Sequence, residues 1–296
     1  MPSAREKMAR RTAQSLLQQE LRITRLPVDP IVIAGMKKPP ILLIERELPP
    51  DIYGAFGKVD GRFVIAISTA CPTPGHRRFT AGHELGHYHL DGHLEHMFAN
   101  GADWVQSKGA HFQLGADPIE READFFASEL LMPENLVRPL VRGQLGIEHV
   151  RRIAGDCEVS LSSAAITLAR LAADLLGVLV SKDGILEWVA LSAALLAYPW
   201  ARRPFKGEWA PPRSATKRLS RDAGAVRRSQ ELQAEGLMCE WFIGAPQGTQ
   251  VVEEAVGLGA YGRVLTVLRP EALPDHDEEQ ERTWSRQRAE WADQDD

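Results

Sequence analysis

The pair His83 and His87, in the stretch "RRFTAGHELGHYHLDGH", places the strongest constraint on how this chain folds. Residues four apart lie one turn apart on the same face of a helix, so the two imidazoles can bind a common ion only if this stretch is helical. Thr73 followed by Pro74 is a typical helix start. We therefore predict a helix that begins near Pro74 and presents two nitrogen ligands to a metal ion.

Glu84 lies about 100° round this helix from His83, on the flank of the ligand face. A carboxylate there can take a proton from an attacking water and pass it to a leaving amine, as in metallopeptidases with the HExxH pattern. The pattern also arises by chance in surface helices. A structural zinc site is closed by four protein ligands and has no need of this carboxylate. Glu84 therefore favours an enzyme over a DNA-binding regulator whose metal site is structural or inactive.

Two residues compete for the role of third ligand. His93 lies ten residues after His83, as in the metzincin pattern, but that pattern needs a glycine where this chain has Leu90. The alternative is Glu120 in "EREADFFASELLMP", where Asp124 follows one turn later and could accept the N–H of a ligating histidine. Glu120 also fits a capping box with Asp117. The helix geometry favours Glu120.

Turn and cap signals predict the elements around these motifs. A strand is expected in "ILLIERE", and a hairpin in "YGAFGKVDGRFVIAIS" around Asp60-Gly61. The run "RFVIAIS" is apolar enough for the sheet interior, or for an exposed edge on which a substrate segment pairs. The predicted helices span residues 4–22, 30–35 after the cap Asp29, 118–132 after the cap Asp117, and 133–144.

The second half of the chain changes in character. Residues 148–174 form a helix-turn-helix pattern, but "LSSAAITLARLAAD" carries only Arg170 as a base, so we expect the segment to pack against the first domain rather than bind nucleic acid. Beyond Gly177, strands are expected in "GVLVS", "GILEWVAL", "LMCEWFIG", "TQVVEEAV" and "RVLTVL". A loop-rich, arginine-rich segment covers 199–231. The acidic residues 271–296 are expected to be disordered.

Length, charge and cysteine content limit the number of domains and the cellular compartment that we expect. The length of 296 residues favours two domains, and the net charge of −5 is too mild to indicate a class of partner. Cys71, Cys157 and Cys239 are far apart, as expected for reduced thiols in a cytoplasm. The N-terminus has no apolar signal region, and no run reaches the length of a membrane span. We predict a cytoplasmic protein without a membrane segment, and the sequence indicates no oligomeric state.

The stretches "RRFTAGHELGHYHL" and "EREADFFASELLMP" resemble the ImmA/IrrE family of bacterial metallopeptidases, and "LPVDPIVIA" and "VIAIS" resemble that family's N-terminal region. The resemblance implies a zincin-like fold, with His83, His87 and Glu120 as metal ligands and Glu84 as catalytic acid/base. Members cleave helix-turn-helix repressors and so release stress, DNA-repair or mobile-element genes. Some carry a middle helical segment, which 148–174 resembles, and a GAF-like sensor domain.

Together these observations predict an α+β protein. Its expected parts are a zincin-like peptidase domain with a small antiparallel sheet (1–145), a helix-turn-helix-like segment (146–175), a strand-rich α/β C-terminal domain that could be a sensor (176–270), and the tail (271–296). The expected activity is that of a metalloendopeptidase whose substrate is a helix-turn-helix repressor. The ligand set suits Zn²⁺ best, although Mn²⁺ or another divalent ion could occupy it.

Overall fold

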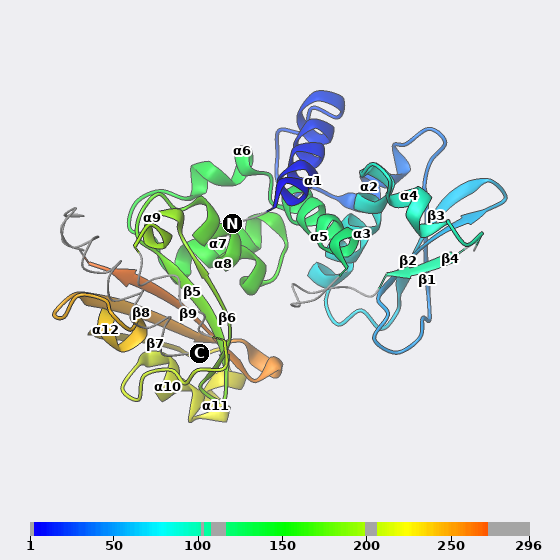
Figure 1. Ribbon diagram of the computed structural model, residues 1–296. Coiled ribbons are helices and arrows are strands. Elements are labelled where there is room, and N and C mark those ends of the chain that lie inside the picture. The colour runs from blue at the N-terminus through cyan, green and yellow to red at the C-terminus, as the bar shows by residue number, and fades with distance from the viewer. Residues whose placement is uncertain (1–2, 102–103, 108–116, 199–205, 272–296) are drawn as a thin grey trace, which may run out of the picture. The chain divides into compact units, whose positions relative to one another are not determined.

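The computed structural model describes residues 3–101, 104–107, 117–198 and 206–271, which form two compact units (Figure 1). The first unit comprises Met1–Leu140 and Ile153–Ser163, and the second comprises Val141–Arg152 and Ala164–Asp296. Each unit contains its own sheet with helices packed against it, which confirms the α+β class. The acidic tail predicted to be disordered lies, from residue 272 onward, outside the described residues.

A four-stranded sheet with the order β1-β3-β2-β4 is the base of the first unit. The elements of this unit are α1 (Ala4–Ser15), a π-helical turn (Leu16–Glu20), α2 (Pro30–Gly35), β1 (Leu42–Arg46), β2 (Gly54–Val59), β3 (Arg62–Ser68), α3 (Pro74–His89), α4 (His93–Met97), β4 (Trp104–Ser107), α5 (Pro118–Leu131), α6 (Glu134–Val137) and a 3-10 turn (Arg138–Leu140). The hairpin strands β2 and β3 are antiparallel, and β1 pairs with β3 in parallel. The sheet is therefore mixed: β2, β3 and β4 pair antiparallel as predicted, and the parallel strand β1 departs from the expected antiparallel sheet. The edge role considered for β3 is also wrong, because β3 lies between β1 and β2.

The predicted helix cap and hairpin turn are present at the expected residues, but one predicted helix is shorter than expected. The Asp29 side chain accepts a hydrogen bond from the backbone N–H of Ile31 at 2.8 Å and so caps α2. Asp60 and Gly61 have φ angles of 49° and 77°, the left-handed pair that a two-residue hairpin requires. The helix expected over 133–144 is wrong in length, because Pro139 cannot donate a backbone hydrogen bond and α6 ends before it.

Helix α3 is held between the sheet and α5, and α1 packs against α5 in turn (Figure 1). The shared core includes Phe56 and Ile65 from the sheet, Leu85 from α3 and Leu130 from α5, all of them fully buried. Full burial of such a side chain contributes about 1.5–3 kcal/mol. The core therefore fixes α3 and α5 relative to each other, which is what the site needs.

The second unit contains a five-stranded sheet in the order β6-β5-β9-β8-β7, in which every pair is antiparallel. Its elements are β5 (Gly177–Lys182), β6 (Ile185–Leu191), α9 (Ala193–Leu196), α10 (Ala215–Ser220), α11 (Ala223–Arg227), β7 (Glu231–Leu237), α12 (Met238–Trp241), β8 (Gln250–Gly257), a 3-10 turn (Gly259–Tyr261) and β9 (Arg263–Pro270). Four of the five strand predictions, for β5, β6, β8 and β9, match these elements within two residues at each end.

One strand prediction for the second unit is wrong, and one strand was not predicted. The stretch "LMCEWFIG" is the short helix α12, whose Met238 and Trp241 are buried three residues apart on one helical face. The real strand, β7, precedes it. Because β7 is an edge strand with alternating exposed side chains, its sequence is too polar to signal a strand. Within the segment expected to be loop-rich, α10 and α11 form helices capped by Ser214 and Asp222.

The predicted helix-turn-helix pattern is present as α7 (Ile147–Cys157) and α8 (Leu161–Leu171). The two helices contribute residues to both units. Glu158, with φ 53°, turns the chain between them. In the part of the chain that the structure describes, no helix is both long and apolar enough to cross a membrane.

Candidate active site

Helix α3 carries the first half of the site. The Thr73 hydroxyl accepts a hydrogen bond from the backbone N–H of His76 at 3.1 Å, and Pro74 occupies the first helical position. Every residue from Thr80 to His87 is buried. The histidines and Glu84 therefore lie on a helix whose position is set by packing on several sides.

Two glycines in α3 allow α5 to approach closely. A Cβ added at Gly86 would lie 3.2 Å from the Cα of Ala123, and one added at Gly82 would lie 3.5 Å from the Cα of Ala127. Glycine in a helix interior costs about 1 kcal/mol relative to alanine. Here that cost is offset because the backbone of α5 packs directly on α3, which brings the carboxylates of α5 to the histidines.

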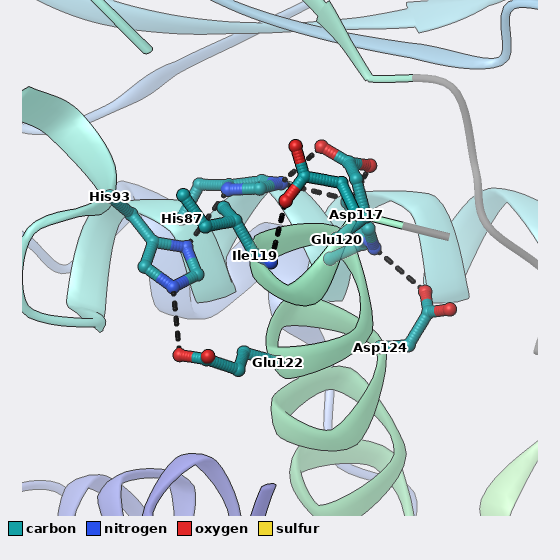
Figure 2. Close-up of polar contacts among 8 residues, drawn as sticks. His87, His93, Asp117, Ile119, Glu120, Glu122 and Asp124 are labelled. Atoms are coloured by element: carbon teal, nitrogen blue, oxygen red, sulfur yellow. Dashed lines mark hydrogen bonds and ion pairs between the residues drawn. The ribbon is translucent and has the colours of Figure 1, made fainter. Parts of the chain in front are cut away.

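Helix α5 supplies the second half. Asp117 caps it by accepting a hydrogen bond from the backbone N–H of Ile119 at 3.0 Å. The carboxylate of Glu120 faces the imidazoles instead of closing a capping box: its oxygens lie 3.2 Å from His83 Nε2 and 3.4 Å from His87 Nε2 (Figure 2). The two Nε2 atoms are 3.0 Å apart. Among the described residues, His83, His87 and Glu120 thus form a group whose ligand atoms all lie within 4.8 Å of one another.

These separations fit a tetrahedral ion. Ligands about 2.0–2.2 Å from a tetrahedral zinc are roughly 3.3–3.6 Å from each other. The three observed separations, from 3.0 to 3.4 Å, are close to that spacing. Asp124 lies 2.8 Å from His83 Nδ1, so the other ring nitrogen remains for an ion, as the sequence suggested.

The electrostatics of the group follow from burial and from its partners. Burial disfavours the charge on His83, but hydrogen bonds with Asp124 and Glu120 outweigh it and raise the pKa to about 10. Burial lowers the pKa of His87 to about 4, so this imidazole is neutral at pH 7. Burial also opposes the charge on Glu120, yet the two histidines lower its pKa to about 2. The Glu120 carboxylate is therefore ionised and can serve as a charged ligand for a cation.

Glu84 is fully buried beside this group, and β2 makes room for it. A Cβ on Gly54 would lie only 2.3 Å from Glu84 Oε1 and 2.6 Å from Thr80 Cγ2. Gly54 was not among the predicted site residues. Its only signal was a glycine at the start of a strand, which is a common mark of a close approach.

Residues 36–169 match the peptidase family described as the IrrE N-terminal-like domain. This segment belongs to that family. The matched range of the IrrE-like domain includes all of α3 and α5, and therefore His83, Glu84, His87 and Glu120. The chain matches no curated protein.

The other histidines of the IrrE-like domain take different places. His93 is buried and lies outside the three-residue group; its Nδ1 atom is 3.0 Å from Nδ1 of His87. His89 stacks on Phe126 at 5.7 Å, and His96 is exposed. The Tyr88 ring packs edge-on against Phe63 in the core beside the sheet.

Proposed function

We propose that this chain is a divalent-metal-dependent endopeptidase, with zinc as the preferred ion, that hydrolyses a peptide bond in a helix-turn-helix transcriptional repressor. The observation that carries the proposal is the convergence of His83, His87 and Glu120 beside the buried carboxylate of Glu84, inside a domain of a peptidase family. The resemblance to repressor-cleaving metallopeptidases supports the choice of substrate. Cleavage would relieve repression of stress or mobile-element genes, and it would take place in the cytoplasm, where the repressor acts.

The donor set agrees with this proposal. Two histidine imidazoles and one carboxylate are the ligands of many catalytic zinc sites. Three protein ligands leave a fourth position for water or substrate. Mn²⁺ or another divalent ion prefers more oxygen ligands than this group offers. A bound divalent ion would supply Lewis-acid polarisation of the scissile carbonyl and of the attacking water.

The remaining roles fall to side chains of the candidate site. His83, His87 and Glu120 would hold the ion, and Asp124 holds the His83 ring in one tautomer through Nδ1. Glu84 would accept the proton of the attacking water and deliver it to the leaving amine. Its burial excludes bulk water from the carboxylate, and Gly54 lets the carboxylate lie against the β2 backbone.

The test is co-expression of the chain with the helix-turn-helix protein encoded beside its gene. Wild type should cleave this partner, and Glu84→Gln should cleave it at least about 10²-fold more slowly while keeping its metal. Glu95→Gln, an exposed change on α4, is the matched control and should cleave normally. Equal cleavage by wild type and Glu84→Gln would remove Glu84 from the mechanism. Intact partner together with tight DNA binding by the chain would favour the alternative, a DNA-binding regulator with a structural metal site.

A further inference from the structure

The two ligating histidines are supported in different ways on the side away from the ion. His83 Nδ1 lies 2.8 Å from a carboxylate oxygen of Asp124. His87 Nδ1 lies 3.0 Å from Nδ1 of a third imidazole, His93. His93 is 2% exposed, and its Nε2 lies 3.3 Å from Glu122 Oε2. Figure 2 shows Glu122 reaching His93 on one side of α5 while Asp124 lies on the other.

The turn after α3 creates this arrangement. Helix α3 ends before Leu90, and Gly92 adopts a left-handed conformation with φ 80°, which a side chain would strain. The chain then reverses into α4, whose first residue is His93. The stretch "LDGH", which has Leu90 where the metzincin pattern has glycine, thus returns His93 to the Nδ1 side of the His87 ring.

Only one assignment of protons satisfies every atom of this chain of contacts. For His87 to offer Nε2 to an ion, its proton must be on Nδ1, which then donates to His93 Nδ1. The proton of a neutral His93 is then on Nε2, where it donates to the Glu122 carboxylate. Arg5 of α1 is the next contact after Glu122: its Nη1 atom lies 3.5 Å from the other oxygen of the Glu122 carboxylate.

We propose that His93 is a positioning residue that fixes the tautomer and the ring orientation of His87, and that Glu122 in turn fixes His93. This inference rests on the proposed function, since it gives His87 the role of a metal ligand. It also assigns a role to the histidine that competed with Glu120 for the ion. His93 supports the site without coordinating, because one of its nitrogens faces His87 Nδ1 and the other faces Glu122.

The test measures metal binding in the full-length protein, with Zn²⁺ as the probe in competition with a chelator. Removing a partner of a ligating histidine typically weakens metal affinity by 10–100-fold, and we expect that loss in His93→Phe. His93→Asn places an amide oxygen near the position of Nδ1 and should recover most of the affinity. Glu122→Gln keeps an acceptor without the charge and should fall between wild type and His93→Phe. His96→Phe, on the same short helix but exposed, is the matched control and should bind as wild type does.

A second readout separates positioning from packing. The visible spectrum of the Co²⁺-substituted protein reports ligand geometry, so it should change in His93→Phe and return toward wild type in His93→Asn. Wild-type affinity in His93→Phe would overturn the proposal. An equal loss of Zn²⁺ affinity in His93→Phe and His93→Asn would also overturn it. Complete loss of metal in both variants would indicate instead that His93 is a ligand. If wild type itself binds no divalent ion, the proposed function fails as well, whereas a binding wild type with an unaffected His93→Phe refutes the positioning role alone.

Discussion

A methyl group at Gly54 is expected to displace the Glu84 carboxylate while leaving His83, His87 and Glu120 in place. The new Cβ would lie 2.3 Å from Glu84 Oε1, whereas ordinary contact begins at 3.4 Å. The carboxylate is the movable end of a side chain, so it must shift by about 1 Å, and a misplacement of that size can cost about 10²-fold in rate. That loss corresponds to about 2.7 kcal/mol of transition-state stabilisation. Thr80 Cγ2, 2.6 Å from the same Cβ, must also give way.

The assay measures kcat/KM for cleavage of the proposed repressor substrate, together with the metal content and the unfolding midpoint of each variant. Gly54→Ala should lose about 10²-fold in kcat/KM, retain one ion per chain, and lose about 1–3 kcal/mol of stability through overpacking. Gly57→Ala is the matched control, because it adds the same atom to the opposite face of β2, where the atom meets the Trp104 ring. Full activity in Gly54→Ala, or an equal loss in Gly57→Ala, would refute the argument that β2 positions Glu84.

Three further outcomes are expected. Glu120→Ala should abolish stable binding of one divalent ion per chain in a folded protein, as elemental analysis would measure; retained metal would contradict its role as ligand. Glu254→Ala removes the carboxylate that accepts a hydrogen bond from the first backbone N–H of α7 at 2.7 Å. It should lower the free energy of unfolding, measured by urea denaturation, by about 0.5–2 kcal/mol. The exposed Glu235→Ala is the control and should leave that free energy unchanged. Burial and a nearby lysine lower the pKa of His89 from 6.5 to about 4 in the folded state, so the protein loses stability as pH falls through that window. His89→Gln should therefore flatten the dependence of Tm on pH between 6.5 and 4, and a slope equal to that of the exposed His96→Gln would contradict this.

The sequence predicted those parts of the site that follow from helix periodicity and caps. The spacing of His83 and His87 within one helix, and of Glu120 and Asp124 within another, follows from 3.6 residues per turn. The caps at Thr73 and Asp117 located both helix starts. These signals are local, so one sequence is enough to read them.

What the sequence could not supply depends on contacts between distant segments. Gly54 matters only because β2 passes Glu84, thirty residues later, and no local pattern records that approach. The choice between edge and interior for β3 depended on whether β1 would pair with it. Strand β7 went unrecognised and α12 was mistaken for a strand, because burial in the second unit is set by tertiary packing rather than by the period of a short run.

Helix α1 lies before residue 36, where the family match begins, yet it belongs to the folded peptidase unit. Leu16 and Leu17, in the π-helical turn that follows α1, are 0% and 1% exposed, and Arg10 and Gln14 of α1 both donate to the buried carboxylate of Glu129 on α5. The first unit therefore includes a packed helix that lies outside the segment matched by the family. A change of 1–2 kcal/mol can alter the abundance of a protein in the cell several-fold. Substitutions in α1 that weaken this packing would therefore lower the abundance of the protein in the cell, through faster degradation of its unfolded form, without changing any residue of the candidate site.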